Sequence, residues 1–230
     1  MSEPVTTPAP PPSSASVFGT RMALAERYVD LLAAEGVKRG LIGPREVDRL
    51  WERHVLNSAV VGELIPCGAT VVDVGSGAGL PGIPLAIARP DLTVTLMEPM
   101  ARRVAWLGEV VAELALPMQV VRGRAEEDVV RQQVGACDIA VARALAPLAR
   151  LASWCLPLIK PAGRVLALKG ASVSEEIARD QPAVLRAGGK PLEVMWCGED
   201  VLDTPTTVAV IELMQSNAGG GRRRRRRKDR

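Results

Sequence analysis

Three glycines, each separated from the next by one residue, directly follow a short valine-rich run. The run, residues 71–74, contains Asp73 and breaks into Gly75, Gly77 and Gly79. Glycine lets the backbone turn sharply and approach a bound molecule where a Cβ atom would collide with it. The spacing therefore predicts the floor of a pocket for a nucleotide-type cofactor at the end of a strand.

Two cofactor classes fit this turn. Residues 77–82 match the Gly-x-Gly-x-x-Gly fingerprint of dinucleotide-binding proteins. Residues 73–79 match the Asp-x-Gly-x-Gly-x-Gly pattern of methyltransferases that use S-adenosylmethionine. The first glycine should end the strand, and Val74 directly precedes Gly75. The second pattern is therefore favoured, and S-adenosylmethionine is the expected cofactor.

A carboxylate, Glu98, ends the next apolar run at residues 93–98. A carboxylate at such a strand end accepts hydrogen bonds from the hydroxyls of an adenosine ribose, which suits either cofactor. The two cofactor classes can be distinguished by the residues that a dehydrogenase needs for catalysis. The single tyrosine, Tyr28, has leucine rather than lysine four positions later, and the sequence shows no second domain with a catalytic histidine. Hydride transfer is therefore disfavoured.

Positive charge follows the expected strand ends. Residues 222–230 carry a net charge of +7, and subtracting this from the chain's +3 leaves −4 for the rest. Ligands of open α/β sheets bind beyond the carboxyl ends of the strands. Five cations expected at that edge predict contacts with the phosphates of a polyanionic substrate, and they are Arg102, Arg103, Arg124, Arg143 and Lys169.

The elements that position these residues alternate from residue 70 onward. Apolar runs predict strands near 70–75, 93–98, 118–123, 137–143, 163–169, 191–197 and 206–213. Helical spacing predicts helices at 82–89, 101–116, 126–134, 147–160 and 173–187. No helix joins the last two strands, which predicts a hairpin and an antiparallel edge strand. The expected fold is α/β, a Rossmann-like class I methyltransferase fold with a seven-stranded, mostly parallel sheet.

Two helices are expected ahead of the sheet, one ending at Gly36 and one running from Pro44 to about residue 65. The predicted division is a disordered extension at 1–16, N-terminal helices packed on the catalytic domain at 17–66, a methyltransferase domain at 67–215 and a flexible polyarginine tail at 216–230. The tail fits nonspecific phosphate binding and an extension without function equally well.

Composition narrows the remaining classes. Cys67, Cys137, Cys155 and Cys197 show no metal-ligand spacing, and the single histidine, His54, also speaks against a zinc site. His54 is expected to pack rather than to act. The first residues do not resemble a signal peptide, and no apolar run approaches the roughly 18 residues that span a bilayer. A cytoplasmic protein with reduced thiols and no membrane partner is expected.

The segment from Val72 to Ala88 resembles the first motif of a bacterial family, the small-subunit ribosomal RNA methyltransferase G or glucose-inhibited division protein B family. The Leu-Pro-Gly at residues 80–82 is far more specific to the family than the glycines alone. Further segments are similar to later family motifs, in order and at similar spacing: 51–54, 98 with 102–104, 124–127, 142–144 and 167–170. The resemblance covers about residues 20–213.

The resemblance implies roles for particular residues. Gly75 and Leu80 would line the cofactor, Ala125 and Glu126 would lie at the adenine, and Arg143 would lie beside the cofactor at the substrate mouth. The motif residues that complete the expected cofactor site are Asp73, Gly77, Gly79 and Glu98. The four cations assigned to RNA are Arg102, Arg103, Arg124 and Lys169.

The activity implied by the resemblance is methylation of guanine N7 in the decoding-region loop of 16S ribosomal RNA. The substrate would be the RNA or the 30S subunit, and the enzyme is expected to be a monomer. Guanine N7 presents a lone pair, so no proton has to be removed before it attacks the methyl group. Alignment of the reactants is then the main catalytic task, and no catalytic acid, base or nucleophile is expected.

Other acceptors remain open but are less favoured. Residues 142–147 do not form the Asn/Asp-Pro-Pro-aromatic loop of amino-group methyltransferases, and Cys137 lies at the start of its strand, away from the site that cytosine carbon-5 methylation would need. The alternatives are a methyltransferase of another RNA position, protein or small molecule, and a noncatalytic RNA-binding protein that keeps the cofactor fold.

Overall fold

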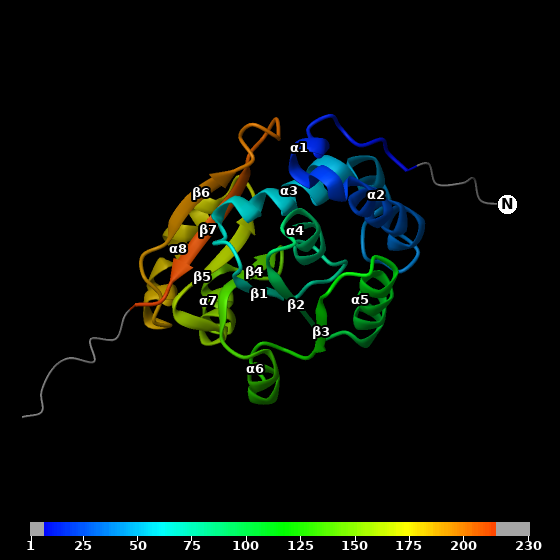
Figure 1. Cartoon of the computed structure of the whole chain (residues 1–230). Helices are drawn as coiled ribbons and strands as arrows, with labels where there is room; N and C mark the ends of the chain where they lie inside the picture. Colours follow the sequence, from blue (N-terminus) through cyan, green and yellow to red (C-terminus); the bar gives the residue numbers. More distant parts are fainter. Residues whose placement is uncertain (1–6, 215–230) are drawn as a thin grey trace, which may run out of the picture.

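The expected seven-stranded, mostly parallel sheet is confirmed in the computed structural model, which describes residues 7–214 (Figure 1). The strand order is β3-β2-β1-β4-β5-β7-β6. The strands are β1 Thr70–Val74, β2 Thr93–Glu98, β3 Gln119–Arg122, β4 Cys137–Arg143, β5 Ile159–Lys169, β6 Glu193–Cys197 and β7 Thr206–Glu212. The order reverses between β1 and β4, and a crevice for ligands opens at the carboxyl ends of strands at such a point.

Helices cover both faces of the sheet, and this explains why the strands are apolar on both sides. Val71 of β1 packs with α4 and α5, whereas its neighbour Val72 packs with α6, α7 and α8. The helices after β1 are α4 Gly82–Ala88, α5 Ala101–Glu113, α6 Asp128–Val134, α7 Leu148–Cys155, η6 Leu156–Leu158 and α8 Val173–Arg186. Each parallel strand therefore directs its carboxyl end, and the loop that follows, to one edge.

The predicted hairpin of β6 and β7 is confirmed, but its place in the sheet differs from the prediction. The antiparallel strand is β7, and it lies between β5 and β6 rather than at the edge. Burial explains the arrangement. Residues 208–211 of β7 are buried, whereas β6 exposes 57% of Trp196 and is the strand that can border solvent. Thr207 of β7 lies opposite both Lys169 and Trp196.

The N-terminal helices cover the α4 side of the sheet (Figure 1). They are α1 Ser14–Phe18, η1 Gly19–Arg21, α2 Met22–Leu31, η2 Leu32–Gly36, η3 Pro44–Arg49, η4 Leu50–Leu56, α3 Asn57–Ala59 and η5 Val60–Leu64. The predicted second helix is therefore helical throughout but changes its winding, from 3₁₀ at η3 to π at η4. Tyr28, Leu50 and Val55 are completely buried beneath this layer.

Order begins before the predicted boundary at residue 16. The indole N–H of Trp51 donates to the carbonyl oxygen of Pro8 at 2.9 Å, and Ser14 is buried at the start of α1. These contacts hold residues 8–16 against the helical layer. Residues 1–6 of the predicted extension, and the predicted polyarginine tail at 216–230, lie outside the described residues.

Two properties of the described residues concern membrane spans and metal sites. Among residues 7–214, no helix is both long enough and apolar enough to cross a membrane. The same residues contain no group of three or more His, Cys, Asp or Glu side chains placed to hold a metal ion.

Candidate active site

The glycine turn begins where β1 ends. Gly75 has φ of 74°, in the left-handed region that favours glycine, and its N–H and that of Ser76 donate to the carbonyl oxygen of Met97 on β2. A Cβ atom on Gly75 would come within 2.6 Å of the Leu145 side chain. Both the backbone conformation and the close approach of Leu145 therefore require glycine at this position.

Asp73 lies beneath this turn and is completely buried. Its Oδ2 accepts a hydrogen bond from the N–H of Gly82 at 3.0 Å, at the start of α4. Its Oδ1 is buried and has no partner among the described residues. Burial, opposed by the Gly82 hydrogen bond, raises the pKa of the Asp73 carboxyl to about 7. The structure thus places a buried carboxyl group with one unpaired oxygen directly under the predicted cofactor turn.

This raised pKa predicts a pH-dependent stability. Between 3.8 and about 7 the folded state holds a proton on Asp73 that the unfolded state has released, so stability falls as the pH rises through this window. Over the full window, the free energy of unfolding falls by ~4 kcal/mol. Asp73→Asn should therefore be progressively stabilised relative to the wild type between pH 4 and pH 8. Urea unfolding of the cofactor-free protein at several pH values measures this difference.

The exposed carboxylate variant Asp200→Asn is the control, and its stability difference from the wild type should not follow this pH course. A constant difference between Asp73→Asn and the wild type from pH 4 to pH 8 would contradict the burial argument.

Glu98 ends β2 beside the turn, as the sequence predicts. Its Oε2 accepts a hydrogen bond from the N–H of Gly77 and its Oε1 from the N–H of Met100, each at 3.0 Å. Arg103 lies further away, with its Nη1 3.8 Å from Oε2. Only 1% of Glu98 is exposed. The carboxylate is therefore fixed at the rim of the turn, and its role toward a ribose stays a prediction.

Two aromatic side chains that the sequence analysis did not assign to the site hold the middle of the turn. The carbonyl oxygen of Ala78 accepts hydrogen bonds from the Tyr28 hydroxyl at 3.1 Å and from the Trp106 indole N–H at 2.8 Å. Burial is the main cause that raises the pKa of Tyr28, so its hydroxyl stays a donor. No local pattern in the sequence marks these contacts, because they join segments far apart in the chain.

A pocket of about 570 Å³, here called the inner pocket, opens at the carboxyl ends of β1 and β4. The predicted residues Gly75, Gly77, Leu80 and Arg143 line it. The remaining lining residues are Leu41, Ile42, Gly43, Glu46, Arg53, His54, Ser76, Ala78, Arg103, Ala144 and Leu145. The structure thus brings most of the predicted glycine-turn residues together with the end of β4. Gly79 does not line the pocket, and its carbonyl oxygen accepts a hydrogen bond from the N–H of Ile83 in α4.

A narrow cleft of about 60 Å³ lies beside the inner pocket. It contains Ala125 and Glu126, the residues expected at an adenine, together with Arg124. Leu145 and Gly75 line both cavities. The Leu145 side chain therefore separates the two cavities, and it follows Ala144, whose φ of 49° is unusual for a residue other than glycine.

Arg143 ends β4 and joins it to the η4 helix. Its guanidinium donates to the carbonyl oxygens of Arg53 and His54 at 3.1 and 3.3 Å and to Ser58 Oγ at 3.2 Å. It also donates to His54 Nδ1 at 2.5 Å. Arginine has no acceptor, so Nδ1 must accept, and the proton of neutral His54 lies on Nε2, which contacts Glu46 Oε2 at 2.7 Å. Burial and the Arg143 charge lower the pKa of His54.

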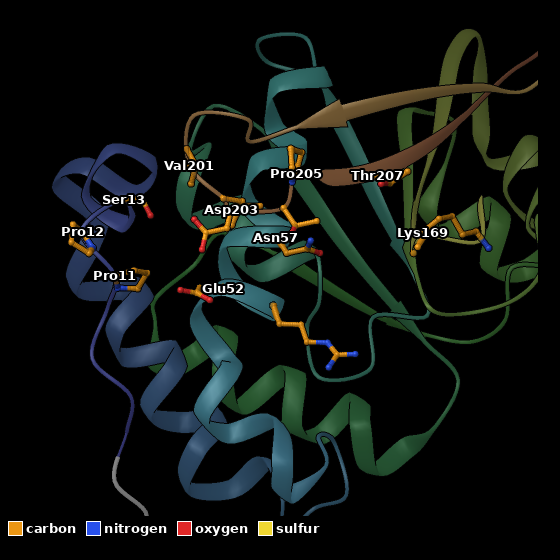
Figure 2. A pocket seen from close by; sticks show the side chains of 15 residues that line it. Pro11, Pro12, Ser13, Glu52, Asn57, Lys169, Val201, Asp203, Pro205 and Thr207 are labelled. Carbon is orange, nitrogen blue, oxygen red and sulfur yellow. The ribbon is translucent and has the colours of Figure 1, made fainter. Parts of the chain in front are cut away.

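A second cavity, here called the outer pocket, adjoins the inner one and has a volume of about 890 Å³ (Figure 2). Arg53 lines both pockets. The outer pocket lies between η4, the end of β5 and the loop that joins β6 to β7. Its other lining residues are Pro11, Pro12, Ser13, Glu52, Asn57, Lys169, Gly170, Ala171, Val201, Leu202, Asp203, Thr204, Pro205 and Thr207.

The five predicted cations do not form one patch. Arg143 and Arg103 line the inner pocket, and Arg124 lines the narrow cleft. The Lys169 side chain is mostly buried. Its ammonium group donates to the carbonyl oxygen of Ala146 at 2.9 Å and to Glu176 at 2.8 Å. Arg102 lies apart, beside Lys38 and Arg39. RNA contacts by Arg102, Arg103, Arg124 and Lys169 therefore stay predictions.

Comparison with known proteins identifies the family. Residues 21–204 match the family model described as rRNA small subunit methyltransferase G. The chain belongs to this family. The resemblance found in the sequence is thereby confirmed, and the matched range contains all residues that line the inner pocket and most of those that line the outer pocket.

Relatives support this membership over most of their length. The ribosomal RNA small subunit methyltransferase G of Rhodococcus jostii is 59% identical over 196 residues, which are 85% of this chain and 86% of that protein. The protein of the same name from Corynebacterium efficiens is 54% identical over 209 residues, 90% of this chain and 89% of that protein.

Solved structures of lower identity share the fold. A putative S-adenosylmethionine-dependent methyltransferase from Methanococcus maripaludis aligns with a TM-score of 0.53 at 14% identity, covering 83% of this chain and 95% of that one. Fibrillarin from Aeropyrum pernix, solved with bound S-adenosylmethionine, aligns with a TM-score of 0.52 at 19% identity, covering 69% of this chain and 74% of that one. The predicted class I methyltransferase fold is thereby confirmed.

Proposed function

We propose that this protein transfers a methyl group from S-adenosylmethionine to N7 of a guanine in 16S ribosomal RNA. Family membership supports ribosomal RNA as the substrate and S-adenosylmethionine as the cofactor. The guanine N7 acceptor follows from the motif resemblance and from the chemistry of the inner pocket. The inner pocket lies at the strand-order reversal, where open α/β sheets bind their ligands.

Two unpaired buried atoms fit the amino acid part of this cofactor. Asp73 Oδ1 is an acceptor and Arg103 Nε is a donor, and neither has a partner within residues 7–214. Buried polar groups are normally paired, so a ligand that carries both an ammonium and a carboxylate group is well matched to them. Gly75, Gly77 and Leu80 would line that ligand in the inner pocket, with Gly79 closing the turn behind them.

The adenosine part of the cofactor would extend toward the narrow cleft. Glu98 would accept hydrogen bonds from the ribose hydroxyls, and Ala125 and Glu126 would border the adenine. When bound, the cofactor supplies a methyl group activated by the positive charge on sulfur. Arg143, anchored on η4, would keep the substrate mouth aligned with the turn.

The state of His54 is the observation that carries this proposal. Both of its ring nitrogens are engaged, Nδ1 by Arg143 and Nε2 by Glu46. His54 is the only histidine of the chain, so no histidine is free to act as a general base at the inner pocket. Guanine N7 needs none, because its lone pair is available without deprotonation. We therefore expect the residues at the pocket to orient the reactants, and catalysis would rest on alignment.

Mapping of 7-methylguanine in 16S RNA tests the proposal. RNA from cells that lack the gene should carry one 7-methylguanine fewer than RNA from the parent strain. The purified protein should restore it on 30S subunits from the deletion strain when S-adenosylmethionine is added. An unchanged set of methyl marks would contradict the proposal, and a lost mark at a different atom would favour the alternative of another RNA position.

A further inference from the structure

The outer pocket is larger than the inner pocket, yet none of the residues expected to hold the cofactor lines it. Arg53 borders both pockets, so they are neighbours across one side chain. A cavity of about 890 Å³ is within the range of small-molecule sites and has room for a nucleotide. A substrate group placed there would lie next to the inner pocket, where the proposed methyl donor binds.

The polar side chains of the outer pocket fall into two groups. Lys169 and Arg53 are paired, with Glu176 and Glu46 respectively. Glu52, Asn57 and Asp203 also line the pocket, with Glu52 and Asp203 exposed to solvent, and their side chains make no hydrogen bond or ion pair within the described part of the chain. Figure 2 shows Glu52 and Asp203 on the side of the N-terminal segment, Lys169 on the opposite side, and Asn57 between them.

Two unpaired carboxylates are unfavourable neighbours for the phosphates of RNA, because both carry negative charge. They are favourable neighbours for a base edge that is rich in donors. Guanine has such an edge, since its N1–H and its 2-amino group are adjacent donors that ionised carboxylates can accept. Adenine has an unprotonated N1, an acceptor, at the corresponding position. The lining therefore favours guanine over adenine.

Building on the proposed function, we infer that the outer pocket takes up the target guanine and that Glu52 and Asp203 accept hydrogen bonds from its N1–H and 2-amino group. Enzymes that act on a base commonly take it out of the stack and read its Watson–Crick edge in a pocket. The carboxylates are thus specificity residues that contact substrate, and they take no part in the transfer itself.

The orientation of the base follows from this contact. In guanine, N7 and the 2-amino group lie at opposite ends of the purine. With the 2-amino end against Glu52 and Asp203, which line only the outer pocket, N7 faces Arg53 and the inner pocket. Asn57 lies between the carboxylates and Lys169 in Figure 2, and its amide would donate to the O6 atom of the guanine. One base orientation therefore satisfies both the carboxylates and the proposed methyl transfer.

A substrate that lacks only the 2-amino group tests the inference. Inosine keeps N7, O6 and N1–H, so 30S subunits reconstituted with inosine at the methylated position isolate the contact to the 2-amino group. The wild-type enzyme should methylate inosine with kcat/KM roughly 10- to 100-fold below that for guanine, the range for a hydrogen bond to a charged group. In the double variant Glu52→Ala with Asp203→Ala, the ratio of the two substrates should fall to near one.

The matched control removes two exposed acids from the same β6–β7 loop. Glu199 and Asp200 do not line the outer pocket, so Glu199→Ala with Asp200→Ala should keep the wild-type ratio. Calorimetry with S-adenosylmethionine should give the same affinity for all three proteins, which establishes that each is folded. Equal methylation of guanine and inosine by the wild type would overturn the inference while leaving the proposed function intact. Failure to methylate either substrate would instead count against the proposed function.

Discussion

Arg143→Met should lower kcat/KM for methyl transfer by roughly 100-fold, the loss expected when a charged donor leaves several acceptors unpaired near a site. The guanidinium of Arg143 joins the end of β4 to two carbonyl oxygens of η4, to Ser58 and to His54. Without it, the helix that borders both pockets loses its hydrogen bonds to the end of β4. Methyl transfer to 30S subunits and S-adenosylmethionine affinity are the two measurements.

Arg143→Lys should rescue little of the activity, because an ammonium group cannot supply the planar fork that reaches all these acceptors. The control is Arg186→Met in the last turn of α8, where the arginine is exposed and lines neither pocket nor the narrow cleft. That variant should retain wild-type kcat/KM. Wild-type activity in Arg143→Met would show that the attachment between β4 and η4 does not matter for the reaction.

Gly82→Ala and Gly108→Ala should change stability in opposite directions. A Cβ atom on Gly82 would come within 2.4 Å of Leu96 Cδ2 and 2.7 Å of Asp73 Oδ2, and both neighbours are completely buried. Neither neighbour has room to move, so Gly82→Ala should lower the free energy of unfolding by about 3 kcal/mol. It would also disturb the hydrogen bond from the Gly82 N–H to Asp73 and so weaken cofactor binding.

Gly108 is the matched control within a helix. It lies in α5, and a Cβ atom there would meet nothing within 4 Å. Alanine costs less conformational entropy than glycine in a helix, so Gly108→Ala should raise the free energy of unfolding by about 0.5–1 kcal/mol. Urea unfolding of both variants measures the two effects. Similar changes in the free energy of unfolding for both variants would mean that Leu96 and Asp73 can move to make room for the added methyl group.

The strands and the glycine turn could be predicted because their causes are local. Runs of buried valine and leucine mark the strands, and a glycine after Val74 marks where β1 must turn. The limits of β5 were less well predicted. It begins at Ile159, four residues before the predicted start, because the register between β4 and β5 shifts after Cys137 and lets an irregular segment join the ladder.

The sequence could predict the site only where its residues lie at the ends of neighbouring strands. The sequence placed Arg143 and Lys169 at the same edge of the sheet, and the structure does so too. It could not determine which partner each cation has, because Glu176 and His54 reach these cations from distant helices. The contacts of Tyr28 and Trp106 with Ala78 were missed for the same reason.

The carbonyl oxygen of Ala78 links three parts of the chain through two hydrogen bonds, one of them from Tyr28, which lies 50 residues upstream. The N-terminal helices therefore help to hold the glycine turn in shape, and the proposed cofactor pocket depends on them as well as on the sheet. A shortened protein starting at β1 would lose Tyr28, one of the two side chains that hold this turn, and would keep Trp106. Designers who wish to graft the reaction onto another scaffold must carry both halves together.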